Sequence, residues 1–342
     1  MALVLALAAA LWGLGALIRA PYSARILMIA LLYVGVLIIQ ILLPENHTLR
    51  TATGGSPGEW LAIGVVGAAI WAYAQGLKLV KSRVRDENRP QEVQKTSSTE
   101  LERNARHIVL REIGGPGQKR LKEARVLVIG AGGLGSPALQ YLAAAGVGTI
   151  GVIDDDVVEN SNLGRQVIHT DARIGMPKVF SAEQAMKAQN PFVTIRPYHR
   201  RLTPEIADDL FSDYDLVLDG TDDADTRYLV NETAVKAKLP LISGAITQWE
   251  GQISLFDPSR GGPCYACVFP EKAADGLAPS CAEGGVLGPL PGVIGTMMAV
   301  EALKHLAGAG ETLLGRMLIY DGLYGDVRTI RLKRRSDCSC CG

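Results

Sequence analysis

A cluster of glycines near residue 130 is the first feature of this sequence that suggests chemistry. The residues from Gly130 to Gly135 read GAGGLG. An apolar strand pattern at residues 125–129 precedes them, a helix pattern follows, and a second apolar strand, residues 149–153, ends at Asp154. Glycines let the backbone approach a ligand closely, and the acid can accept hydrogen bonds from a ribose. The motif predicts a nucleotide site that includes Gly130, Gly132, Gly133, Gly135 and Asp154, and taken alone it favours NAD or FAD.

Positively charged residues around this motif change the interpretation. Arg165 lies in the segment SNLGRQ, residues 161–166, just after the acid, and Lys178 begins the next predicted helix. Arg106 lies upstream in ERNARHIVLREIG. Two arginines and a lysine exceed what a dinucleotide pyrophosphate usually requires, but they suit the charge of a triphosphate. The alternative is that they are scattered surface charges.

A pair of carboxylates follows another predicted strand, residues 216–219. Asp222 and Asp223 lie in the sequence GTDD at the end of this strand. A carboxylate at this position could hold Mg²⁺. The residues therefore favour a nucleoside triphosphate with Mg²⁺, and a nicotinamide-dependent oxidoreductase is the alternative class of enzyme.

Four cysteines form two C-x-x-C pairs that lie far apart in the sequence, Cys264 with Cys267 and Cys338 with Cys341. Four thiolates from two distant segments suit a closed, tetrahedral structural Zn²⁺ site, and a redox dithiol is the alternative. Cys340 is a surplus thiol beside the second pair.

The elements that must position these residues alternate between strands and helices from about residue 124 onward. This order predicts an α/β fold with a mainly parallel sheet. The 35 basic residues balance the 35 acidic ones, and no basic stripe with interleaved aromatic residues appears. We therefore expect no nucleic acid partner.

The first eighty residues are a different kind of sequence. Three uncharged apolar runs cover residues 2–18, 26–43 and 60–77, and a helix needs about 20 apolar residues to cross the hydrocarbon core of a membrane. We predict a membrane anchor of three transmembrane helices in residues 1–80 and a flexible linker in residues 81–100. A cleaved signal peptide, or a hairpin with an interfacial segment, is the alternative.

Basic residues predict how this anchor is oriented. They lie between the first two runs, at Arg19 and Arg25, and again after the third run, from Lys78 to Arg89. Positive residues stay on the cytoplasmic side. The expectation is an inner (cytoplasmic) membrane protein with its N-terminus outside and residues 101–342 in the cytoplasm.

Beyond the linker, residues 101–342 resemble the MoeB/ThiF/HesA branch of the ubiquitin-activating enzyme superfamily, and most closely the molybdopterin-synthase adenylyltransferases. The motifs that carry the resemblance are ERNARHIVLREIG, VLVIGAGGLGSPALQYLAAAGVGTIGVIDDDVVENSNLGRQ, DGTDDADTRYLVN, SGAITQWEGQISLF, CYAC, PSCAEGGVLGPLPGVIG and CSCCG. The resemblance implies a Rossmann-like ubiquitin-activating-enzyme fold with a zinc knuckle. It also implies ATP-dependent adenylation of the C-terminal glycine of a ubiquitin-like sulfur carrier that ends in Gly-Gly. The expected carrier is the molybdopterin synthase small subunit (MoaD type) of molybdenum cofactor biosynthesis, and the thiamine-pathway carrier (ThiS type) is the alternative.

The resemblance also assigns roles to individual residues. Arg165 and Lys178 would grip the phosphates, and Asp222 would bind Mg²⁺. Arg106 would reach the ATP of a partner subunit, which implies a homodimer. The remaining residues expected to contact ATP are Gly130, Gly132, Gly133, Gly135, Asp154, Ser161, Asn162, Leu163, Gly164, Gln166 and Asp223.

This sequence departs from the family pattern at three positions and retains a cysteine of special interest. His107 and Gly164 replace glutamines, and Asp223 stands where asparagine is usual. In relatives, a cysteine at the position of Cys281 forms a thioester or persulfide with the carrier. A covalent role for Cys281 is therefore weighed against an ordinary loop cysteine, and adenylation itself needs no nucleophilic side chain.

Overall fold

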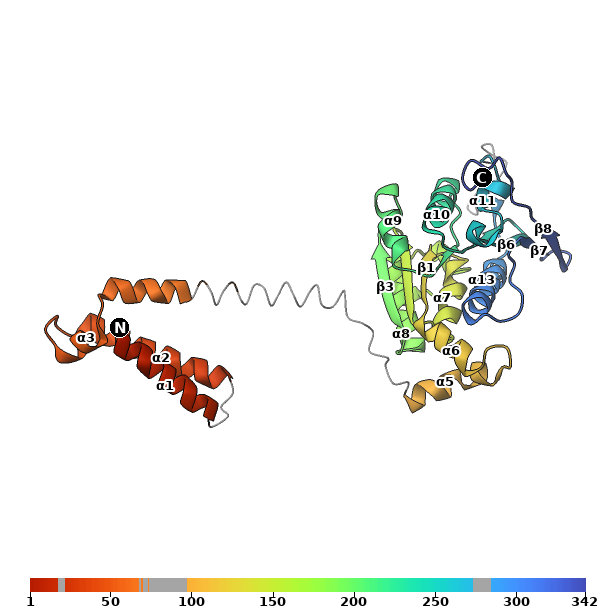
Figure 1. The fold of residues 1–342 in the computed structure, drawn as a ribbon. Coiled ribbons are helices and arrows are strands. Elements are labelled where there is room, and N and C mark those ends of the chain that lie inside the picture. The colour runs from red at the N-terminus through yellow and green to blue at the C-terminus, as the bar shows by residue number, and fades with distance from the viewer. Residues whose placement is uncertain (18–21, 68, 70–72, 74–96, 273–283) are drawn as a thin grey trace. The chain divides into compact units, whose positions relative to one another are not determined.

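The computed structural model describes residues 1–17, 22–67, 69, 73, 97–272 and 284–342 (Figure 1). The chain divides into two compact units, Met1–Lys95 and Thr96–Gly342. The first helix of the second unit, α5 (Ser98–Val109), begins near the end of the segment expected to be a linker. Ser97 caps this helix, because its side chain accepts a hydrogen bond from the Glu100 amide at 3.1 Å.

The first unit is a small group of packed helices. It contains α1 (Ala2–Leu17), α2 (Tyr22–Leu42), α3 (Thr48–Thr53) and a further helical stretch at residues 57–67. Val4, Val36 and Trp60 are buried where three of these segments meet. The Gln40 side chain donates to the Thr53 hydroxyl at 2.8 Å, which ties the end of α2 to α3.

The prediction of three membrane-spanning helices needs correction. Among the residues that the structure describes, one helix is long and apolar enough to span a membrane, Ala24–Leu42, and only 11% of its apolar window is buried. The first apolar helix, Ala2–Gly15, is too short, since 14 residues at 1.5 Å per residue cover about 21 Å of a core about 30 Å thick. The third run, residues 60–77, lies partly outside the described residues. The structure thus supports one candidate span in place of three.

The second unit is built on an eight-stranded sheet with the order β3-β2-β1-β4-β5-β6-β7-β8. The first five strands are parallel to one another, and the last three are antiparallel additions. The predicted α/β fold with a mainly parallel sheet is therefore confirmed. The strands are β1 (Arg125–Ile129), β2 (Thr149–Asp154), β3 (Thr194–His199), β4 (Leu216–Asp219), β5 (Leu241–Ile246), β6 (Glu250–Phe256), β7 (Arg316–Asp321) and β8 (Asp326–Arg331).

Helices cover both faces of this sheet (Figure 1). Alternate side chains of β1 point to opposite faces, so Val126 and Val128 join one apolar cluster while Leu127 and Ile129 join the other. Four described helices cover the first face or its end: α6 (Gly114–Glu123), α7 (Gly135–Ala144), α8 (Lys178–Gln189) and α13 (Pro289–Ala307). Three lie against the second face: α9 (Pro204–Ser212), α10 (Ala224–Ala237) and α11 (Tyr265–Val268).

The parallel strands determine where a ligand can bind. Their carboxyl ends all lie at one edge of the sheet, and the loops that follow β1, β2 and β4 are the ones that contain the predicted nucleotide residues. In open α/β sheets, ligands bind outside the carboxyl ends of the strands. Three short 3₁₀ helices, η1 (Asn160–Asn162), η2 (Asp171–Arg173) and η3 (Pro258–Arg260), complete the described elements.

Candidate nucleotide-binding site

The glycine turn joins β1 to α7 and depends on two of its glycines. Gly130 has a φ of +90°, a backbone conformation that side chains rarely adopt. At Gly135, an added Cβ would collide with the Gly130 carbonyl group. The turn can therefore close tightly only with glycine at both positions, and it presents the first turn of α7 toward the carboxyl edge of the sheet.

Asp154 lies at the end of β2 and is held against this turn. One carboxylate oxygen accepts a hydrogen bond from the Ala131 amide at 2.7 Å, and the other accepts one from the Asp156 amide at 2.8 Å. Burial raises the pKa of Asp154, while the Lys178 charge acts in the opposite direction. The structure thus places the predicted ribose acceptor directly beside the glycine turn.

His169 belongs to the same site, although no sequence motif predicts it. Its Nε2 lies 2.9 Å from the Ala131 carbonyl oxygen, and its Nδ1 lies 2.9 Å from the Ser181 hydroxyl oxygen. Because the carbonyl can only accept, Nε2 carries the proton and Nδ1 accepts from the Ser181 hydroxyl. Burial lowers the pKa of His169, which favours this neutral ring. The imidazole therefore links the glycine turn to α8.

The segment Ser161–Gln166 folds over the turn through η1. Asn162 and Gln166 are buried, and the Oδ1 and Oε1 atoms of their amides have no hydrogen-bond partner among the described residues. The Gln166 side chain lies against the glycine turn, since a Cβ added at Gly132 would be 3.8 Å from Gln166 Nε2. Buried acceptors without a donor are costly. These two oxygens suit ligand donors such as ribose hydroxyls or an adenine amino group.

Two cations of this region differ in environment. Lys178 begins α8, its side chain is only 7% exposed, and its Nζ lies 2.6 Å from an Asp156 carboxylate oxygen. Arg165 is half-buried, and it donates to the Ser161 carbonyl at 3.0 Å. One cation is thus fixed in place, and the other is open to a ligand in solution.

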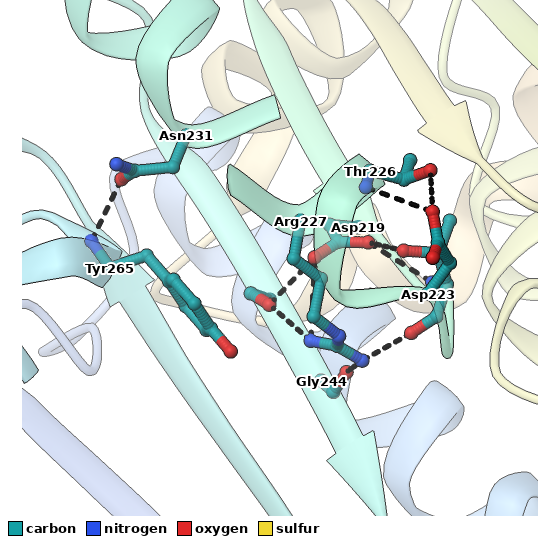
Figure 2. A network of polar contacts seen from close by, with 9 residues as sticks. Asp219, Asp223, Thr226, Arg227, Asn231, Gly244 and Tyr265 are labelled. Atoms are coloured by element: carbon teal, nitrogen blue, oxygen red, sulfur yellow. Dashed lines mark hydrogen bonds and ion pairs between the residues drawn. The ribbon is translucent and has the colours of Figure 1, made fainter. Parts of the chain in front are cut away.

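The loop after β4 contains the predicted Mg²⁺ ligand. Asp222 is exposed, and it makes no hydrogen bond or ion pair with the described part of the chain. The carboxylate of Asp223 instead caps α10, because it accepts from the Thr226 amide at 3.0 Å and from the Thr226 hydroxyl at 2.6 Å (Figure 2). These bonds lower the pKa of Asp223. Asp222 is therefore the carboxylate that is free to hold a cation, while Asp223 is occupied as a helix cap.

Arg106 lies away from this site within its own chain. It is an exposed residue of α5, which packs against α6. The Gln118 side chain of α6 donates to the Ala145 carbonyl at the C-terminal end of α7, whereas the glycine turn precedes the N-terminal end of that helix. Arg106 is thus at the opposite end of α7 from the predicted phosphate site, and the fold of one chain does not bring it there.

The four predicted metal ligands meet in one buried cluster. The Sγ atoms of all four cysteines lie within 4.8 Å of one another. The separations are 3.8 Å for Cys264 and Cys267, 3.6 Å for Cys264 and Cys338, and 3.4 Å for Cys267 and Cys341. A tetrahedral Zn²⁺ with Zn–S bonds of about 2.3 Å places its sulfurs about 3.8 Å apart, so the cluster fits that ion.

Two further contacts distinguish the ligands from the surplus thiol. The Arg335 amide donates to the Cys267 sulfur at 3.5 Å, which suits a thiolate. Cys340 lies outside the group of four and accepts from the Asn231 side chain at 3.2 Å. The predicted pairing of Cys338 with Cys341 is thus the one that the fold brings together. Cys281, the predicted covalent residue, lies outside the described residues.

Comparison with known proteins defines the class of fold and then the family. A crystal structure of E. coli MccB with ATP matches the chain with a TM-score of 0.62 at 23% identity, over 76% of this chain and 80% of that one, which shows a shared fold. The model of the ThiF family matches residues 104–340. The chain therefore belongs to the ThiF family.

Relatives with assigned names lie within this family. The chain is 48% identical to the sulfur carrier protein adenylyltransferase of Thermus thermophilus over 247 residues, which is 71% of this chain and 91% of that protein. It is 52% identical over 241 residues to the probable adenylyltransferase/sulfurtransferase MoeZ of Mycobacterium tuberculosis, over 70% of this chain. The match spans 62% of the length of the mycobacterial protein. A third relative, the SAMP-activating enzyme E1 of Haloferax volcanii, is 46% identical over 72% of this chain and 90% of that protein.

Proposed function

We propose that this protein uses ATP to adenylate the C-terminal glycine of a ubiquitin-like sulfur carrier protein. The observation that carries the proposal is the set of groups at the carboxyl edge of the sheet. The glycine turn with Asp154 suits a nucleoside, the buried cation Lys178 and the open cation Arg165 suit phosphates, and Asp222 is free for a cation. Relatives that share this family are named as adenylyltransferases, one of them for a sulfur carrier protein.

The chain's own residues supply position and charge. Asp154 accepts hydrogen bonds from the ribose, and the oxygens of Asn162 and Gln166 accept from donors of the nucleoside. Lys178 and Arg165 offset the negative charge of the triphosphate, which would otherwise repel the attacking carboxylate of the carrier. The nucleophile belongs to the carrier, so the protein acts mainly by positioning the two substrates.

Asp222 is the residue that would hold Mg²⁺. Its carboxylate is exposed, has no hydrogen-bond or ion-pair partner in the described part of the chain, and follows β4 at the same carboxyl edge of the sheet. Mg²⁺ is usually bound through one or two carboxylates and the substrate phosphates. When bound there, the ion would screen the phosphate charge during transfer. Zn²⁺ would be held by the four-cysteine cluster, where its role is structural.

A homodimer would complete the site. Arg106 lies on an exposed helix face at the far end of α7 from the glycine turn. A second copy of the chain would supply Arg106 to the phosphates of its partner and add a third cation to each site.

The first unit would attach the enzyme to the inner membrane. The span Ala24–Leu42 leaves most of its apolar surface outside the protein interior. Arg19 precedes its N-terminal end, and Arg25 is its second residue. Positive residues mark the cytoplasmic side, so this end of the span would be cytoplasmic. A second crossing, by the third apolar run at residues 60–77, would return the chain to the cytoplasm, and the basic residues from Lys78 to Arg89 that follow this run favour a cytoplasmic catalytic unit.

The carrier would be of the MoaD type, which makes the enzyme a molybdopterin-synthase adenylyltransferase, and a ThiS-type carrier is the second candidate. The test is ATP–pyrophosphate exchange with purified carriers that end in Gly-Gly. We expect exchange that depends on one carrier type and on Mg²⁺, and no exchange with a carrier shortened by its last glycine. Absence of carrier-dependent exchange with every candidate would refute the proposal.

A further inference from the structure

The loop that contains Asp222 is fastened by a buried arginine, Arg227. This residue lies in the first turns of α10, and its side chain is only 9% exposed. Its guanidinium bridges the loop after β4 to the neighbouring strand β5 (Figure 2). The acceptors are the Thr221 carbonyl, the Gly244 carbonyl at 2.8 Å, the Ser243 hydroxyl at 3.0 Å and an Asp219 carboxylate oxygen at 3.4 Å.

Neutralising the buried Asp219 is only part of the role of this guanidinium. Asp219 already accepts hydrogen bonds from the Thr221 amide at 3.0 Å, the Thr221 hydroxyl at 2.7 Å and the Ser243 hydroxyl at 3.0 Å. Its contact with Arg227 is the longest of the four. Two of the other contacts go to backbone carbonyl groups, so the guanidinium mainly fixes backbone geometry.

The Thr221 carbonyl is the contact that bears on the site. It belongs to the peptide bond that leads into Asp222, so the bond from Arg227 sets the direction in which the Asp222 carboxylate leaves the loop. A planar guanidinium can hold Thr221 and Gly244 at once, whereas an ammonium group is a point charge on a flexible stem.

The cysteine knuckle holds the same helix one turn further on. Asn231 is four residues after Arg227 and therefore on the same face of α10. Its Oδ1 accepts from the Tyr265 amide at 2.8 Å, and its Nδ2 donates to the Cys340 sulfur at 3.2 Å (Figure 2 shows the Tyr265 contact). Tyr265 lies between two of the clustered cysteines, and it lines one small pocket together with Arg227.

We propose that Arg227 is a positioning residue for Asp222, and that the knuckle keeps Arg227 in register through Asn231 and Tyr265. The inference rests on the proposed adenylation reaction, in which Asp222 holds the cation. One face of α10 thus connects the structural cysteine site to the catalytic loop. Arg227 acts on Asp222 through its hydrogen bond to the Thr221 carbonyl.

The test uses the full chain with the substitution Arg227→Lys, which keeps the charge but not the planar geometry. We expect carrier-dependent exchange to fall about 100-fold in kcat, the cost of misplacing a catalytic group by about 1 Å. The KM for ATP should stay close to that of the wild type, and the Mg²⁺ concentration for half-maximal rate should rise. Hydrogen–deuterium exchange of the amides in residues 219–223 should become faster without any substrate, while bound zinc is unchanged.

A second variant tests the link to the knuckle. Asn231→Ala should also speed amide exchange and raise the Mg²⁺ concentration for half-maximal rate, but by less than Arg227→Lys. The matched control Glu232→Gln, at an exposed neighbouring position, should change neither. Wild-type amide exchange and Mg²⁺ response in Arg227→Lys would overturn the inference, as would a raised KM for ATP with an unchanged kcat. If the wild type activates no carrier, the proposed function fails, and the amide exchange of the two variants still decides whether Arg227 and Asn231 hold the loop.

Discussion

The substitution Lys178→Met tests whether the buried cation of the site acts on the triphosphate. Methionine is similar in length and apolar, so it fills the space of a side chain that is only 7% exposed. The fold should tolerate the change, because the carboxylate left behind on Asp156 has a side chain that is 65% exposed and can be hydrated.

The size of the effect follows from burial. Two unit charges about 4 Å apart interact by about 4 kcal/mol at an effective dielectric constant of about 20. The Asp156 carboxylate lies 2.6 Å from the ammonium group and partly neutralises its charge, which weakens its attraction for a phosphate. We therefore expect a loss near the lower end of what one charge-stabilising donor contributes, about 2.7 kcal/mol or 100-fold in rate.

The assay is carrier-dependent ATP–pyrophosphate exchange, with Lys187→Met as the matched control. Lys187 lies on the same helix and makes an ion pair of the same length, 2.6 Å to Glu183, but its side chain is 53% exposed. Exposed pairs of this kind contribute little, so the control should exchange at the wild-type rate. An unchanged rate in Lys178→Met, with the protein folded, would refute the assignment of this cation to the phosphates.

Further predictions concern the metal, the second subunit and pH. Metal analysis should find one zinc per chain, lost in Cys341→Ser and kept in Cys340→Ser; the reverse result would show that the wrong thiol is paired. Mixing Arg106→Ala with Asp222→Ala should restore part of the exchange activity through heterodimers with one intact site, and no recovery after verified subunit exchange would count against a shared site. In urea unfolding of residues 96–342, stability should be fully present above about pH 6.5 and fall below it, because burial lowers the folded pKa of His169 and the unfolded chain binds the extra proton. His169→Gln should flatten this dependence by up to about 1.4 kcal/mol per pH unit, and an unchanged slope would contradict the buried neutral ring.

The central strands could be predicted from the sequence because both faces of the sheet are covered. Strands β1, β2 and β4 are nearly continuous apolar runs, and they begin where the sequence predicts them. Strand β3 escaped prediction, since this edge strand reads TIRPYH and most of its side chains are at least partly exposed. The strand at residues 216–219 is the third that the sequence predicts, and because β3 precedes it, it is the fourth along the chain. The antiparallel position of the β7–β8 hairpin beyond β6 depends on long-range pairing, which no local pattern in the sequence specifies.

The candidate site divides in the same way. The glycine turn, Asp154 and the two C-x-x-C pairs could be predicted, because each belongs to a local sequence motif. His169 and Arg227 could not, because each acts on backbone carbonyls that only the tertiary fold brings near. Their signal in the sequence is faint, a histidine in an apolar stretch and an arginine eight residues after the end of β4. The role of Asp223 as a helix cap likewise appears only in the folded chain.

The spacing of the cysteine cluster has a consequence for the order of assembly. The two half-sites lie 74 residues apart, and the intervening chain includes α13, β7 and β8. Closing a loop of that length in a disordered chain costs about 4 to 5 kcal/mol by chain-entropy estimates. In the folded protein the two cysteine pairs are already close together, so metal binding does not have to close this loop. The folded protein should therefore bind a metal roughly a thousandfold more tightly than the unfolded chain. Metal uptake would thus be a late event in folding, one that reports whether the antiparallel half of the sheet has reached its correct register.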